Sequence, residues 1–360
     1  MDTGNQAEVG LDVALMAYRR VEREQELPVP ALVRSGGVPV FRFHPMDLPH
    51  ACSVSIEIQH GRIEGEIRNA YHRVALSDIC GAWFRRSRNS YSGPVNATSE
   101  KLTDYVKAQN NATLDALFHG LRTLWVSHPY VLRRAEIKAL QLAAASKAGL
   151  TTPNTLISND PARARAFVDA LGDKQCAIKP QLALGVTDER GYHLPLTAIL
   201  PPSYPLEALA AQAHTIFQPY VDKAAELRCV VIGERIFTAR INSQAYESTR
   251  IDWRAAGHRE QDIFSLPDQV KASIHRLMDS FEINFASIDM ILTPDGEFVF
   301  LELNPNGQWL WLEIELGLPL TAAMADLLTT NYARRAERTE GAAAVDATRQ
   351  DSQSKAAHVS

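Results

Sequence analysis

The residues best suited to chemistry lie in the stretch from Ser287 to Glu313. Its pattern predicts two antiparallel strands, Ile288–Leu292 and Glu297–Leu303, joined by a turn centred on Pro294-Asp295-Gly296. Proline presets the first turn angle and glycine accepts a positive φ, so these residues are typical of a β-hairpin. The sequence therefore predicts a hairpin that ends in polar residues.

Alternation along the second strand predicts that Glu302 and Asn304 share one face while Leu301 and Leu303 point into the core. Asp289, on the partner strand, is placed to join the two polar residues. Two carboxylates and an amide oxygen form a hard oxygen site, of the kind that holds Mg²⁺ through substrate phosphates. The alternative is a surface hairpin whose polar face is acidic. The hairpin alone does not decide between them.

Composition limits the classes of function. A chain of 360 residues can bury a large core and divide into two or three lobes. Its net charge of −5 gives no basic field for nucleic acid. The cysteines lack metal-ligand spacing, and no apolar run approaches a membrane span. We expect a cytoplasmic protein with neither nucleic acid nor a membrane as its partner.

The elements that position the polar residues follow an α/β pattern. Val13–Tyr18 is a candidate first strand of an α/β domain that extends to about residue 125. A helix is predicted over Leu132–Gly149, ending at a glycine cap, and it carries Lys138. Cys176–Pro180 is a short strand that places Lys179 at its end.

The second half of the chain supplies the remaining candidates. Thr215–Val221 is a strand that breaks at Pro219. Glu226–Ile232 and Arg235–Asn242 form a hairpin, and Pro267–Asn284 is an amphipathic helix. The composition from Ala336 onward is typical of a disordered tail.

Short motifs follow one another in a specific order. They are Ala82-Trp83-Phe84-Arg85-Arg86, Arg134–Leu142, Gly149–Thr155, Ile178-Lys179-Pro180, Gln218–Lys223, Glu226-Leu227-Arg228 and Phe300–Trp309. Together they resemble the ATP-grasp ligases over residues 38–330. Within that group the closer resemblance is to the microviridin-type synthetases, which crosslink side chains of ribosomal peptides to make graspetides (ω-ester-containing peptides).

The resemblance implies an ATP-grasp fold of the α/β class. Residues 1–125 would form an N-terminal pre-ATP-grasp α/β domain, and residues 126–214 a central ATP-grasp subdomain with a lid loop. Residues 215–335 would form a C-terminal subdomain with the Mg²⁺ site, followed by the tail at 336–360. The proposed lid, Leu182–Leu194, lacks a glycine-rich run, which puts a phosphate cradle there in doubt.

Lysines are compact point charges suited to nucleotide phosphates, so Lys138 and Lys179 are candidate ATP ligands. By the resemblance, Gln218, Pro219, Tyr220 and Val221 form the hinge that reads adenine, and Glu226 accepts from the ribose hydroxyls. Each has a plainer interpretation. Lys138 could be a solvated helix lysine, the hinge an ordinary strand end, and Glu226 a solvated hairpin residue.

The resemblance assigns Asp289, Glu302 and Asn304 to Mg²⁺. Phosphoryl transfer also requires cations beyond the metal. Arg228 and Arg240, on neighbouring strands, are candidate catalytic residues. Arg254, in Asp252-Trp253-Arg254, matches a short motif of the subset, although it could equally be a surface arginine on a loop.

The function implied is an ADP-forming ligase that uses ATP and Mg²⁺. It would phosphorylate Asp or Glu side chains of a ribosomal precursor peptide and link them to Thr/Ser as esters or to Lys as amides. The resemblance further implies dependence on the leader of the precursor, and a homodimer. One alternative is a ligase that adds an amino acid to a peptide or small acid. Another is a nucleotide-binding regulator without catalysis, which would have no reason to keep the metal-site residues.

Overall fold

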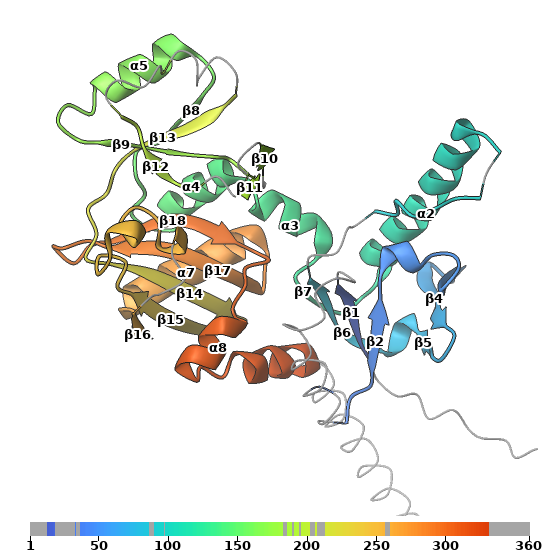
Figure 1. Ribbon diagram of the computed structural model, residues 1–360. Helices are drawn as coiled ribbons and strands as arrows, with labels where there is room; N and C mark the ends of the chain where they lie inside the picture. The colour runs from blue at the N-terminus through green and yellow to red at the C-terminus, as the bar shows by residue number, and fades with distance from the viewer. Residues whose placement is uncertain are drawn as a thin grey trace, which may run out of the picture. The chain divides into compact units, whose positions relative to one another are not determined.

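The computed structural model describes residues 13–18, 33, 37–85, 90–96, 98–182, 186–188, 191–193, 196–201, 206, 213–255 and 260–330 (Figure 1). These residues form two compact units. One contains the described residues up to Pro129 together with those from Pro319 onward, and the other is Tyr130–Leu318. The boundaries predicted at residues 125 and 214 stay predictions, and the predicted tail at 336–360 lies outside the described residues.

The first unit is an α/β structure, as its sequence predicts. Its four-stranded sheet has the parallel order β2-β1-β6-β7. The strands are β1 (Val13–Tyr18), β2 (Val40–Phe43), β6 (Ile79–Arg85) and β7 (Leu124–Val126). An antiparallel sheet joins β3 (Cys52–Gln59), β4 (Arg62–Asn69) and β5 (Arg73–Ala75), and α2 spans Glu100–Gly120. The short 3₁₀ turns η1 and η2 cover Pro45–Asp47 and Leu76–Asp78.

The helix predicted over Leu132–Gly149 is instead two helices, α3 (Pro129–Ala135) and α4 (Lys138–Lys147). Ile137 has an extended backbone between them, with φ −81° and ψ 105°. The buried Gln141 side chain donates to the carbonyl of Ala135 at 2.6 Å and so replaces a helical partner. Apolar periodicity continues across the break, so the sequence pattern does not reveal it. As a result, Lys138 stands at the start of α4.

A small antiparallel sheet in the second unit has the order β12-β9-β13-β8. Its strands are β8 (Leu156–Ser158), β9 (Cys176–Lys179), β12 (Ala198–Ile199) and β13 (Thr215–Pro219). Helix α5 (Pro161–Asp169) packs on it, and its N-cap Asp160 accepts from the N–H groups of Ala162 and Arg163. Strands β10 (Val186–Asp188) and β11 (Gly191–His193) form a hairpin within the proposed lid.

The five-stranded sheet of the second unit has the antiparallel order β16-β15-β14-β17-β18. Its strands are β14 (Ala225–Ile232), β15 (Arg235–Ile241), β16 (Gln261–Ile263), β17 (Phe285–Leu292) and β18 (Phe298–Asn304). Helices α4 and α7 (Asp268–Phe281) pack on one face, where Leu227, Ile274, Phe281, Ile288 and Phe300 form its core (Figure 1). The opposite face of this sheet carries the polar residues.

The predicted hairpin is confirmed as β17 and β18, and Gly296 in its turn has φ +87°. The prediction that Leu301 points into the core is wrong. Asp289 pairs with Glu302 but the next residue, Met290, pairs with Phe300, so Leu301 is the extra residue of a β-bulge. The bulge interrupts alternation, and Phe300 and Leu303 enter the core while Leu301 and Glu302 face the polar side.

Several short elements have no counterpart in the sequence predictions. Among them are α8 (Leu310–Leu316) and the 3₁₀ turns η3 (Glu247–Thr249) and η4 (Trp253–Ala255). In the part of the chain that the structure describes, no helix has both the length and the apolar character that crossing a membrane requires.

Candidate active site

A cavity lies within the second unit, walled by the polar face of the five-stranded sheet, the small sheet and the start of α4. Most of the residues predicted from the sequence line it: Lys138, Lys179, Gln218, Pro219, Tyr220, Val221, Glu226, Arg254, Asp289 and Glu302. They come from seven separate segments, which the fold brings to one place. Arg228, Arg240 and Asn304 do not line the cavity.

Asp289 and Glu302 face each other across β17 and β18 at one end of the cavity. Burial raises the pKa of Asp289, which Arg228 only partly counteracts. Burial by itself also raises the pKa of Glu302, but the charge and hydrogen bond of Lys138 outweigh it and bring that pKa to about 2. Glu302 is therefore a carboxylate at neutral pH, held against the lysine.

Gln141 explains why Lys138 reaches Glu302. Its amide donates to the Leu303 carbonyl at 2.7 Å, and its oxygen accepts from the Leu303 N–H at 3.0 Å. Both main-chain groups lie on the open edge of β18, so a single buried side chain fixes α4 to that strand. Lys138 precedes Gln141 by three residues and shares its helix face. The α4 lysine is thereby placed beside the β18 carboxylate.

Lys179, at the end of β9, projects into the same region. Burial lowers its pKa to about 8, with Glu302 acting in the opposite direction. Among the described residues it makes no ion pair, whereas Lys138, Lys223 and Arg254 are each paired with a carboxylate. A half-buried ammonium without an ion-pair partner among the described residues is suited to an incoming phosphate.

Arg228 stands behind the carboxylates and does not line the cavity. Its Nη1 lies 2.9 Å from each carboxylate oxygen of Asp289, and its Nη2 donates to the Gln308 carbonyl at 3.1 Å. Gly307 lets this loop approach, because a Cβ there would lie 2.4 Å from the Ser287 side chain. Arg228 therefore orients the Asp289 carboxylate without itself lining the cavity.

The expected place of Arg240 beside Arg228 requires correction. Arg240 pairs with Leu227, so it lies on the α7 face of the sheet, away from the cavity. There it forms an ion pair with Asp262 on β16, and that hydrogen bond raises the pKa of Arg240. Neighbouring strands do not put two arginines on one face unless their register also agrees.

Asn304 pairs with Ser287, two residues along the strands from the Asp289–Glu302 pair, and is exposed. Its side-chain oxygen accepts from the Asn306 N–H at 3.1 Å. No three His, Cys, Asp or Glu side chains of the described residues form a metal-binding group. The two facing carboxylates, Asp289 and Glu302, instead suit Mg²⁺ that is shared with phosphate oxygens. Asn304 as a third ligand stays a prediction.

The segment after β13 supplies the opposite end of the cavity. Gln218 is buried and donates to the Thr155 hydroxyl at 2.9 Å, and the Tyr220 N–H donates to the Gln175 carbonyl at 2.7 Å. The Tyr220 N–H is therefore already hydrogen-bonded within the protein and is not free to donate to a ligand. Glu226 accepts from Lys223 at 2.7 Å, and both side chains are buried. Burial raises the pKa of Glu226 against the lowering effect of Lys223.

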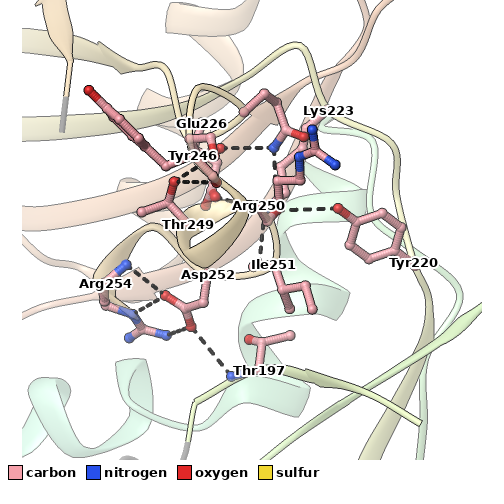
Figure 2. A network of polar contacts seen from close by, with 12 residues as sticks. Thr197, Tyr220, Lys223, Glu226, Tyr246, Thr249, Arg250, Ile251, Asp252 and Arg254 are labelled. Atoms are coloured by element: carbon pink, nitrogen blue, oxygen red, sulfur yellow. Dashed lines mark hydrogen bonds and ion pairs between the residues drawn. The ribbon is translucent and has the colours of Figure 1, made fainter. Parts of the chain in front are cut away.

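Two polar residues of the cavity were not assigned roles from the sequence: Lys223 and Asp252. Asp252 is buried, and its carboxylate accepts from Nε of Arg254 at 2.8 Å and from Nη2 at 2.7 Å. It also accepts from the Arg254 main-chain N–H at 3.1 Å (Figure 2). Burial alone would raise the pKa of Asp252, but these bonds lower it. Two features of the sequence could have indicated them: Lys223 lies three residues before Glu226, and Asp252 lies in the same short motif as Arg254.

Comparison with known proteins agrees with this geometry. Residues 134–328 match the model of the RimK-like ATP-grasp domain. The macrocyclase MdnC from Microcystis aeruginosa MRC, solved with its precursor peptide MdnA, is 27% identical, with a TM-score of 0.74 over 88% of this chain and 99% of that one. An ATP-grasp ligase associated with ribosomal peptides from Chryseobacterium gregarium, in complex with ADP and a leader and core peptide, is 24% identical. Its TM-score is 0.79, over 89% of this chain and 97% of that one. None of the curated proteins compared with the chain matches it.

The chain belongs to the RimK-like ATP-grasp family and has the ATP-grasp fold. It is an ADP-forming ATP-grasp ligase, in a family that uses ATP and Mg²⁺. The predicted resemblance to the microviridin-type enzymes is confirmed at the level of structure, by the matches to MdnC and to the related macrocyclase MdnB.

Proposed function

We propose that this ligase modifies a ribosomally made precursor peptide by joining its side chains. It would activate Asp or Glu carboxylates and link them to Thr or Ser hydroxyls as esters, or to Lys amines as amides, and it would depend on the precursor's leader. The likeness to MdnC, over nearly the whole of both chains, is the observation that carries this proposal.

The nucleotide would occupy the cavity described above. Tyr220 and its hinge neighbours would hold the adenine, the second oxygen of Glu226 would accept from the ribose hydroxyls, and Lys138 and Lys179, which line the cavity, would bind the phosphates. Asp289, Glu302 and Asn304 would hold Mg²⁺, which when bound neutralises the phosphate charge. Arg228 would act through Asp289 as a positioning residue, and Arg254 would hold the acceptor side of the substrate.

The reaction would proceed in two displacements. A substrate carboxylate oxygen attacks the γ-phosphorus, the bond to the β-phosphate oxygen breaks, and ADP leaves an acyl phosphate behind. The hydroxyl or amine then attacks the acyl carbon, releasing inorganic phosphate and a proton. Phosphorylation is needed because oxide is not a leaving group. Positioning and charge neutralisation supply the catalysis.

The test is coexpression with the precursor encoded beside this chain, followed by mass spectrometry of the peptide. We expect the loss of one water mass per crosslink, and treatment with mild base would separate esters from amides. ADP release without that loss would contradict crosslinking. ADP release on a free amino acid, with a matching gain in peptide mass, would favour the amino-acid-adding ligase of the same family.

A homodimer is also part of this proposal, and light scattering would test it.

A further inference from the structure

One residue of the proposed adenine hinge and one residue just after it bind a distant segment of the chain. The Tyr220 hydroxyl donates to the Arg250 carbonyl at 3.3 Å, and Lys223 Nζ donates to the Ile251 carbonyl at 2.9 Å (Figure 2). These two carbonyls immediately precede Asp252, Trp253 and Arg254. The nucleotide end of the cavity is thus bonded directly to the segment that carries the acceptor-side candidates.

Lys223 is the stronger of the two links. Its side chain is buried, and it donates at the same time to the Glu226 carboxylate at 2.7 Å and to the Ile251 carbonyl. Breaking the bond to Glu226 would leave a buried carboxylate without its partner, and breaking the bond to Ile251 would leave a main-chain carbonyl without its donor. The positions of Glu226 and Ile251 therefore depend on each other through one amine.

The segment itself has limited support of its own. Within it, Thr249 Oγ1 donates to the Ser243 carbonyl at 2.8 Å and Gln244 donates to the Arg250 carbonyl at 3.3 Å. At its far end the Thr197 N–H donates to Asp252 at 3.4 Å, and Trp253 packs against Trp311 with ring centroids 5.5 Å apart. Ser243, Thr249, Asp252 and Trp253 are buried, whereas Arg250, Ile251 and Arg254 are exposed, so the backbone is least supported at Arg250 and Ile251.

We propose that Lys223 is a positioning residue through which nucleotide binding orders the segment from Ser243 to Ala255, and thereby sets Asp252 and Arg254 for the acceptor. The proposal rests on the ribose-binding role proposed for Glu226. The lysine uses one oxygen of Glu226, which leaves the other for the nucleotide. A ribose hydroxyl bound to the other oxygen would hold the Glu226 carboxylate in the position from which it accepts from Lys223. Fixing Lys223 then fixes the Ile251 carbonyl.

The test is amide hydrogen exchange of the segment with and without saturating ADP and Mg²⁺, using the full chain and no peptide. In the wild-type protein we expect ADP to slow exchange from Thr249 to Asp252 at least several-fold. In Lys223→Met, ADP still binds by calorimetry but no longer slows that exchange. Lys179→Met is the control, because it removes another lysine that lines the cavity. It should bind ADP more weakly and yet keep the slowing at saturation.

Two results would overturn the proposal: unchanged exchange in the wild-type segment at saturating ADP, or a Lys223→Met variant that keeps the full slowing. The first needs no variant, so it holds even if Lys223→Met fails to fold. If Lys223 only stabilised the fold, Lys223→Met would raise the exchange rate equally with and without ADP, and ADP would still slow exchange by the wild-type factor. ADP affinity in Glu226→Gln separates the premise from the coupling. If Glu226→Gln binds ADP as tightly as the wild type, Glu226 does not belong to the nucleotide site. If Glu226→Gln binds ADP more weakly but ADP does not slow exchange in the wild-type segment, only the role of Lys223 is contradicted.

Discussion

At the scale of single residues, Lys179 is distinguished by its charge state. Its pKa of about 8 means that the ammonium of the free enzyme loses its proton above that pH. A phosphate beside it favours the protonated form, so nucleotide binding takes up a proton when the pH exceeds about 8. Raising the pH across this range should therefore weaken ATP binding rather than strengthen it.

We expect the dissociation constant for ATP to rise above pH 8, by up to about tenfold per pH unit. Lys179→Met should bind roughly 10- to 100-fold more weakly and lose this pH dependence, because a charge-assisted bond is removed. Calorimetric titrations at several pH values measure both effects. Lys174→Met, at an exposed lysine, serves as the control and should follow the wild-type curve.

Glu302 has the clearest role among the carboxylates, since its low pKa keeps it charged beside Lys138. Glu302→Gln preserves the shape but removes the charge needed to hold Mg²⁺. We expect ADP formation to fall by about 100-fold or more with little change in the thermal midpoint. A coupled assay for ADP, with Glu234→Gln at an exposed turn as the control, measures this. Activity close to that of the wild type would remove Glu302 from the site.

At the scale of elements, the join between α4 and β18 determines the geometry of the phosphate end. Gln141 meets both main-chain groups of Leu303 and the carbonyl of Ala135, and replaces the strand that the sheet edge lacks. The helix break before Lys138 exists for the same reason. One buried side chain thus sets the relation of a lysine to a carboxylate that is 164 residues away in sequence.

Gln141→Leu keeps the volume but leaves these backbone groups unsatisfied. We expect a loss of about 2–5 kcal/mol in the free energy of unfolding, together with a higher KM for ATP as Lys138 shifts. Urea denaturation and initial-rate kinetics measure the two effects. Gln109→Leu, on the exposed side of α2, should stay within about 0.5 kcal/mol of the wild type. Equal effects of the two substitutions would contradict the role of Gln141.

At the scale of the whole molecule, the chain returns to its first unit at the end. Helical residues 320–330 belong to that unit, and Leu320, Met324 and Leu328 are fully buried. The first unit is therefore built from two separated stretches, while the second is continuous. Burial of these three side chains is worth roughly 1.5–3 kcal/mol each.

Ending the chain after Leu318 should consequently destabilise the first unit, because its buried face loses those side chains. We expect a lower yield of soluble protein and a first unit that is cleaved early in limited proteolysis. Ending the chain after Thr330 is the matched control and should keep the wild-type proteolysis pattern. If both truncations behaved alike, the packing of residues 320–330 would not be important for the first unit.

The sequence by itself determined the hairpin at β17–β18, the α/β pattern and the order of lysines, hinge and carboxylates. Turn residues and alternation act over a few positions, so they can be recognised without neighbours. Tertiary structure alone decided the face of Arg240, the bulge at Leu301, the helix break before Lys138 and the partners of Lys223 and Asp252. Each of these depends on cross-strand register or on a hydrogen bond between segments, and neither is encoded by the spacing of residues along the chain.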